Sequence, residues 1–142
     1  MGFTTIGQAC AEVDFAEEPF VPVQLELTAI TVDCPDPRVL AAFYQRATGW
    51  EPHPDSGAEF AALRRPDGLV VGFQRVDDYQ APQWPDPGAP QQFHLDFAVD
   101  DLAEAEAMLL GLGAVKAEEQ PGGDRWRVLV DPAGHPFCLT GN

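Results

Sequence analysis

The stretch that decides the fold is Ala29–Gly49, AITVDCPDPRVLAAFYQRATG, because its order of features returns in His94–Gly113, HLDFAVDDLAEAEAMLLGLG. Each copy has an alternating apolar segment of strand type, an acidic residue that can cap a helix, an apolar helical stripe and a closing glycine. The two copies begin 65 residues apart. An internal repeat of this kind predicts two supersecondary units that share one core.

Each copy continues past its helix into two apolar segments that flank a turn rich in proline, aspartate and glycine, which is typical of a β-hairpin. These hairpins span residues 58–76 and 125–141, and a weak strand is expected near 114–118. One such unit cannot bury its sheet alone. We therefore predict the α+β class, with paired βαβββ modules that form one curved mixed sheet around a cleft and helices outside.

The same pattern sets the boundaries of the modules. Residues 1–24 contain no sustained period and are expected to be an N-terminal extension, and 25–76 form the first module. Residues 77–92 hold four prolines without periodicity and predict an extended linker, which 93–142 follow as the second module. The alternation in QLELTAITVD, residues 24–33, predicts that the first strand starts near the beginning of that segment.

Charge and composition exclude several classes of partner. The chain has 142 residues with 23 acidic and 8 basic side chains, and its net charge is −15. Such a chain, with Lys116 as its one lysine, lacks the basic surface that nucleic acids and anionic membranes require. Three cysteines without CxxC spacing (Cys10, Cys34, Cys138), together with an N-terminus unlike a secretory signal, indicate a reduced, cytoplasmic protein.

Three segments together resemble the vicinal oxygen chelate superfamily, which includes glyoxalase I, bleomycin-resistance proteins and extradiol dioxygenases. They are LTAITVDCPDPRVLAAFYQRATGWE (27–51), QQFHLDFAVDDLAEAEAMLLGLGA (91–114) and RVLVDPAGHPFCL (127–139), and the resemblance covers about residues 25–141. It implies paired βαβββ modules, frequent homodimers and a cleft where a divalent metal can bind.

The resemblance also implies where metal ligands belong, at the first and last strand of each module. Those places here are Ala29, the stretch 72–74, His94 and Cys138. Ala29 has no donor atom where His or Gln is usual, and Cys138 stands where Glu is common. The remaining donor set is Gln74, His94 and Cys138, for zinc, nickel, manganese or iron.

Strand periodicity places a candidate base beside the histidine. His94, Asp96 and Ala98 share one face of their strand, while the alternate apolar residues suit packing under a helix, so His94 and Asp96 should face the cleft. Asp96 can act as a general base, and His94 is either a metal ligand or a cleft histidine hydrogen-bonded to Asp96. By the same parity Gln74, Thr31 and Asp33 face the cleft from the first module.

Other candidates have more than one interpretation. Trp84 in the linker packs on its own protein, on a dimer mate, or over the cleft as a wall. At Trp126 either the indole or the two flanking arginines face the cleft. Cys138 is expected to be a small buried hydrophobe, His135 a turn residue and His53 an exposed loop residue.

Three functions follow from these residues. The first is a metal-dependent enzyme acting on a small oxygenated substrate, with Asp96 or a bound water moving a proton. The second is a metal-free protein that binds a small molecule, cationic or planar and aromatic, because acidic charge and tryptophans near a cleft attract such ligands. The third is a regulatory module without chemistry of its own.

Overall fold

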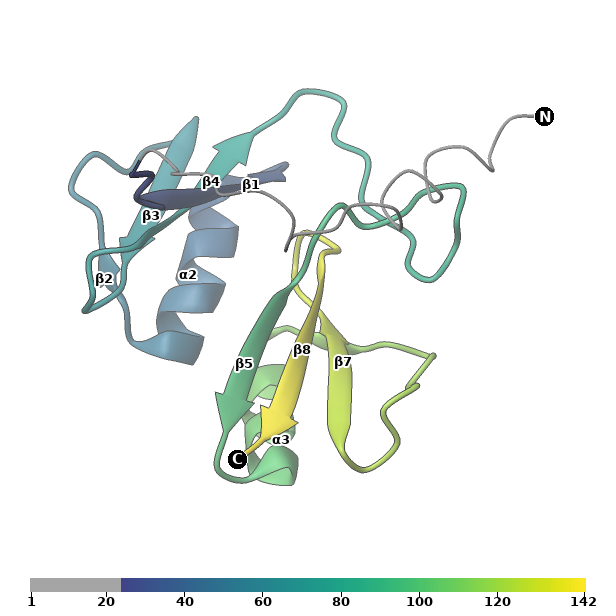
Figure 1. Ribbon diagram of the computed structural model, residues 1–142. Helices are drawn as coiled ribbons and strands as arrows, with labels where there is room; N and C mark the ends of the chain where they lie inside the picture. Colours follow the sequence, from purple (N-terminus) through teal and green to yellow (C-terminus); the bar gives the residue numbers. More distant parts are fainter. Residues whose placement is uncertain (1–23) are drawn as a thin grey trace, which may run out of the picture.

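Two modules of the same topology make up residues 24–142, the part of the chain that the computed structural model describes (Figure 1). Residues 1–23 of the predicted extension lie outside the described residues. The first module contains β1 (Ala29–Cys34), α2 (Pro37–Thr48), β2 (Glu51–Pro52), β3 (Phe60–Arg64) and β4 (Val70–Arg75). The second contains β5 (Leu95–Val99), α3 (Leu102–Leu112), β6 (Val115–Lys116), β7 (Trp126–Val130) and β8 (Pro136–Gly141). The predicted class and element order are confirmed.

Each module has its own four-stranded sheet, in the orders β1-β4-β3-β2 and β5-β8-β7-β6. In both sheets the first strand pairs in parallel with the last, and the hairpin strands pair antiparallel. The single continuous sheet of the prediction is therefore two sheets in residues 24–142. The edge strands β1 and β5 do not pair with each other, and residues of both line a groove of about 450 Å³.

β1 begins at Ala29 rather than near Gln24, so the predicted strand was too long. Its partner β4 begins at Val70, which is opposite Ala29 in the register. One residue before β1, the Thr28 carbonyl oxygen still accepts a hydrogen bond from the Val70 N–H at 3.0 Å. Leu25 is 89% exposed because the sheet offers no strand for its segment to pair with.

The helices begin and end where the sequence predicts. Asp36 caps α2 by accepting from the backbone N–H groups of its first turn, and Gly49 ends the helix with a φ of 74°. Asp101 accepts from the Glu104 N–H at 3.0 Å, and Gly113 ends α3 with a φ of 116°. These left-handed positions favour glycine, since an L side chain is strained there.

Aromatic side chains from both modules form the common core. Phe137 of β8 lies 6.1 Å from the ring centres of Phe43 and Tyr44 in α2, and 6.0 Å from that of Phe97 in β5. Tyr44 also stacks on Phe73 of β4 at 5.5 Å. Because α2 packs on both sheets, the helix-covered faces of the modules meet within one chain.

A buried carboxylate joins the two modules. Asp131, in the turn between β7 and β8, is 4% exposed, and its Oδ2 accepts from the Tyr44 hydroxyl at 2.7 Å. Its Oδ1 accepts from the N–H groups of Ala133 and His135 at 2.9 and 3.0 Å. Burial raises the pKa of Asp131 above its ordinary value, and the Tyr44 hydrogen bond opposes that rise.

Among residues 24–142 no helix covers the opposite face of either sheet, which we call its free face. In β1, Thr31 and Asp33 are exposed while Val32 is buried, and β5 alternates in the same way. Within one chain the free faces are not brought together, so the residues predicted to line one cleft are divided between separate pockets. Neither α2 nor α3 is long and apolar enough to cross a membrane.

Candidate functional site

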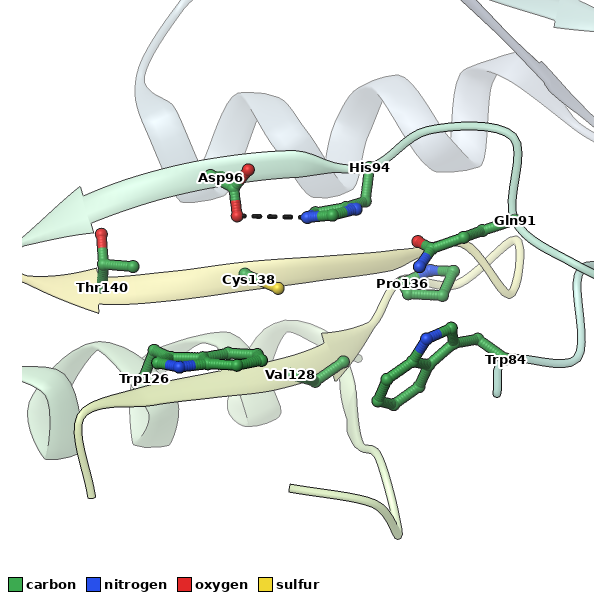
Figure 2. A pocket seen from close by; sticks show the side chains of 9 residues that line it. All are labelled: Trp84, Gln91, His94, Asp96, Trp126, Val128, Pro136, Cys138 and Thr140. Atoms are coloured by element: carbon green, nitrogen blue, oxygen red, sulfur yellow. Dashed lines mark ion pairs between the residues drawn. The ribbon is translucent and has the colours of Figure 1, made fainter. Parts of the chain in front are cut away.

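A pocket of about 390 Å³ lies on the free face of the second sheet (Figure 2). Strands β5, β7 and β8 form its floor, and the linker forms one wall. Its lining residues are Trp84, Gln91, His94, Asp96, Trp126, Val128, Pro136, Cys138 and Thr140. We call this the His94 pocket.

Strand register explains how these side chains meet. Asp96 pairs with Cys138, and Cys138 pairs with Val128, so these three residues form one row across the sheet on the same face. Trp126 and Thr140 form the next row. Because side chains alternate along each strand, a two-residue step keeps all of them on the face opposite the core.

Asp96 is the common partner of an imidazole and a thiol. His94 Nε2 lies 3.3 Å from Asp96 Oδ1, and both side chains are partly exposed (Figure 2). One ligand atom each of His94, Asp96 and Cys138 lies within 4.8 Å of the others. The pairing of His94 with Asp96 agrees with one of the two roles considered for the histidine.

Burial, followed by the negative charge of Asp96, raises the pKa of the Cys138 thiol to about 11. The thiol is therefore protonated at neutral pH and is a poor nucleophile. This matches the expectation that Cys138 packs as a small hydrophobe.

The donor set suits a borderline-soft divalent metal. Imidazole nitrogen, carboxylate oxygen and thiolate sulfur are all zinc ligands, so Cys138 would lose its proton on binding the metal. Three protein ligands leave a fourth position for water or substrate. The side chains that would hold such a metal are His94, Asp96 and Cys138, and all three line the pocket. Gln74, which the predicted set included, does not line this pocket.

The linker holds Trp84 against the pocket through a compact loop. The Gln83 N–H donates to the Ala89 carbonyl oxygen at 2.7 Å, and the Asp86 N–H donates to the Gln83 carbonyl oxygen at 2.6 Å. The Gly88 N–H donates to Asp86 Oδ1 at 2.8 Å. Trp84 thus forms a wall of the pocket, one of the three placements considered for it.

Trp126, and not its neighbouring arginines, lines the pocket. The next residue, Arg127, projects from the other face toward α3, where its Nε lies 3.7 Å from Glu106 Oε2. Glu106 is largely buried and also lies 3.2 Å from the Lys116 ammonium. The Glu106 side chain is only 16% exposed, because Lys116 and Arg127, from the chain beyond the helix, lie against it.

The predicted first-module residues lie away from the His94 pocket within one chain. Thr31 and Asp33 line a second pocket, of about 470 Å³, together with the linker and His135. Gln74 is opposite Asp33 in the register and exposed on the same sheet face. Two free sheet faces, one from each module, therefore carry the two halves of the predicted site.

Sequence reasoning missed several residues with structural or lining roles. Val128 and Thr140 follow from strand parity with Trp126 and Cys138, whereas Gln91 stands in a linker without a pattern.

His135 is more than a turn residue, because its Nε2 lies against the Asp33 carbonyl oxygen and 3.1 Å from the Tyr79 hydroxyl. His53 is only 25% exposed, and its Nδ1 accepts from the Asp55 N–H.

We expect slow alkylation of Cys138 in protein stripped of metal by a chelator. At mildly alkaline pH the raised pKa leaves little thiolate, so iodoacetamide should modify Cys138 at well below the rate of a free cysteine. Asp96→Asn removes the charge that raises this pKa and should speed the reaction. Mass spectrometry of digested peptides measures both rates, and an equal rate in wild type and variant would contradict the assigned influence of Asp96.

The comparisons with known proteins agree on one family of folds. Residues 29–140 match the model of a family described as a glyoxalase-like domain. None of the curated proteins compared with the chain matches it in sequence.

Solved structures share the architecture at low identity. A glyoxalase/bleomycin resistance protein/dioxygenase family enzyme from Burkholderia phytofirmans PsJN superposes with a TM-score of 0.63 at 17% identity, covering 82% of this chain and 98% of its own. A mutant fosfomycin resistance protein from Listeria monocytogenes, complexed with Mn(II) and 1S,2S-dihydroxypropylphosphonic acid, gives 0.63 at 21% identity and covers 83% and 93%. A possible glyoxalase from Bacillus cereus gives 0.61 at 16% identity, covering 82% and 99%. At these identities the likeness shows the fold.

Proposed function

The chain belongs to the glyoxalase-like domain family, and from this premise we propose that it binds a small, flat, cationic molecule in the His94 pocket. The observation that carries the proposal is the lining itself, in which two indoles from different elements and one carboxylate line the same pocket. Aromatic faces attract cations through their quadrupole, and a nearby carboxylate adds to that attraction.

Hydrogen-bonding groups in the pocket favour a ligand that donates. Gln91 Oε1 is buried and has no hydrogen-bond partner among the described residues. Asp96 supplies a carboxylate, and neither lysine nor arginine lines the pocket. A buried acceptor without a donor costs free energy, so an amino or iminium group on the ligand would be bound there.

We also infer that two chains form a homodimer. Among residues 24–142, the free faces have no covering helix and the edge strands β1 and β5 have no partner on one side. Such an edge carries backbone groups able to pair with another strand. A second copy that placed its first sheet over the His94 pocket would add Thr31, Asp33 and Gln74 to it. Sedimentation or light scattering tests this, and a monomer at the concentrations used for binding would contradict it.

Binding is tested with two flat dyes of opposite charge. We expect proflavine, a planar cation, to bind and anilinonaphthalene sulfonate, a planar anion, to bind poorly, because the net charge of −15 repels the anion. His94→Ala and Trp84→Ala should each weaken proflavine binding by about 10-fold, which corresponds to ~1.4 kcal/mol. Fluorescence titration measures the dissociation constants.

His53→Ala is the matched control, since His53 does not line the pocket and its loss should leave proflavine binding unchanged. Trp84→Phe keeps an aromatic face and should retain most of the affinity. If wild type and both pocket variants bind proflavine equally, the pocket is not the binding site.

A second candidate, a metal-dependent reaction on a small oxygenated substrate, is favoured by the cluster of His94, Asp96 and Cys138. A divalent metal held there would polarise a substrate oxygen, while the opposite walls of the pocket orient the substrate. Added zinc should then protect Cys138 from alkylation in wild type and fail to do so in His94→Ala. Zinc that leaves the alkylation rate of wild type unchanged would remove this candidate.

We place the protein in the cytoplasm. Cys34 and Cys138 are free and buried, which suits a reducing compartment. A cysteine-alkylation assay on cells lysed under acid, which traps thiols as they stand, would show both residues reduced; oxidised residues would contradict this placement.

A further inference from the structure

The loop that precedes β7 contacts the indole of Trp126, a wall of the His94 pocket. Its residues 120–123 run beside β7, and Gly122 is buried in this contact. A Cβ atom added at Gly122 would overlap the Trp126 ring at Cγ, Cδ2 and Cε2. The φ of Gly122 is not in the left-handed range, so the contact with Trp126, and not the backbone, is what requires a glycine here.

A glutamine side chain fixes this loop onto the strand. The Val128 N–H donates to Gln120 Oε1 at 2.9 Å, and Gln120 Nε2 donates to the Val128 carbonyl oxygen at 2.8 Å. The same Nε2 donates to the Ala117 carbonyl oxygen at 2.9 Å. The Ala117 N–H also donates to the Val128 carbonyl oxygen at 3.2 Å, so the Gln120 amide extends the pairing of β6 with β7 and anchors the loop just before Gly122.

We infer that Gly122 is a specificity-determining position of the His94 pocket, because it sets how far the Trp126 indole stands into the cavity. The inference rests on the proposed function of that pocket. With one side of the ring against Gly122 and the ring itself lining the pocket, a larger residue at 122 displaces the indole toward the ligand. A glycine here keeps the pocket wide enough for a flat ring system.

The position of the indole is measured without any ligand. The chain has three tryptophans, so protein labelled with fluorotryptophan gives three fluorine resonances, and Trp126→Phe assigns one of them. Gly122→Ala should shift the Trp126 resonance and leave that of Trp50 in place. Gly111→Ala is the matched control, because a Cβ there meets nothing within 4 Å, and it should shift none.

Proflavine then reports the consequence for binding. Gly122→Ala should weaken proflavine binding by about 10-fold, or ~1.4 kcal/mol. In a Trp126→Ala background the same substitution should have no further effect, since the ring it displaces is gone. If Gly122→Ala alone unfolds the protein, the double variant still tests the contact between residue 122 and the Trp126 ring. A folded double variant supports that contact, and an unfolded one contradicts it.

An unchanged Trp126 resonance in Gly122→Ala overturns the inference. So does a loss of proflavine affinity on Gly122→Ala that is equal in wild type and in the Trp126→Ala background. These results differ from a failure of the proposed function. Wild-type protein that binds no proflavine contradicts the proposed ligand class, while the fluorine comparison still decides the role of Gly122.

Discussion

Phe137→Ala should lower the free energy of unfolding by about 3–5 kcal/mol, the usual cost of removing a buried phenylalanine ring. Phe137 is 1% exposed, and its ring contacts both α2 and β5. The cavity would therefore lie between the modules rather than inside one of them. Denaturant titration measures the change, and we expect both modules to lose stability together.

Phe60→Ala is the matched control for this substitution. Phe60 is 37% exposed on the free face of the first sheet, where its ring lies over Gly72. Its removal leaves no closed cavity, so a cost of only ~1 kcal/mol or less is expected. Equal losses in the two variants would show that Phe137 does not join the modules as described.

Tyr44→Phe should destabilise the protein by about 1–3 kcal/mol at neutral pH, because it leaves a buried carboxylate oxygen of Asp131 without its donor. The substitution removes one hydroxyl and keeps the ring that packs on Phe73 and Phe137. The loss therefore measures the hydrogen bond at 2.7 Å and not the packing.

The effect of Tyr44→Phe should depend on pH in a defined direction. Burial raises the folded-state pKa of Asp131 above its ordinary value of 3.8, and removing the Tyr44 hydroxyl, which lowers it, raises it further. The folded protein then holds the proton more tightly than the unfolded chain, so stability is lost as pH rises through the folded pKa. Destabilisation should be small at acid pH and grow toward neutral pH.

Asp131→Asn provides the reference for this pH dependence. With no ionisable group at 131, the cost of Tyr44→Phe should be the same at every pH at which the protein is folded. Denaturant titrations of the four proteins across the acid range measure these differences. If Tyr44→Phe lowers the free energy of unfolding by the same amount at every pH in protein that retains Asp131, the Asp131 carboxyl is not the group responsible.

Local signals predicted the helices because each end is fixed by its own residues. Asp36 and Gly49 bound α2, and Asp101 and Gly113 bound α3, as their side-chain and backbone chemistry requires. The start of β1 was misplaced for the opposite reason. Its limit is set by Val70, a partner distant in the sequence, and alternation in residues 24–33 carries no information about that partner.

Strand parity likewise predicted that His94 and Asp96 lie together on one face of the second sheet. Asp96 and Cys138 meet because β5 and β8 pair in register, and His94 immediately precedes β5. Trp126 lines the same pocket from β7. The position of Thr31, Asp33 and Gln74 relative to them depends on how the modules pack.

That packing rests on contacts such as Tyr44 with Asp131 and with Phe137, which join residues far apart in the chain. No periodic pattern in either module reports such a contact. The sequence therefore placed residues correctly on their strands but not the two sheet faces relative to each other.

The parallel pairing of β1 with β4, and of β5 with β8, has a consequence for the order of folding. In each module these strands are the first and the last, so they meet only after everything between them has been brought into a closed loop. Closing this loop lowers the chain entropy before the parallel strands gain any stabilising contact. The hairpins β3–β4 and β7–β8 need only short loops, because their strands are neighbours in the sequence. We therefore expect the two hairpins to form early, and β1 and β5 to dock last onto β4 and β8.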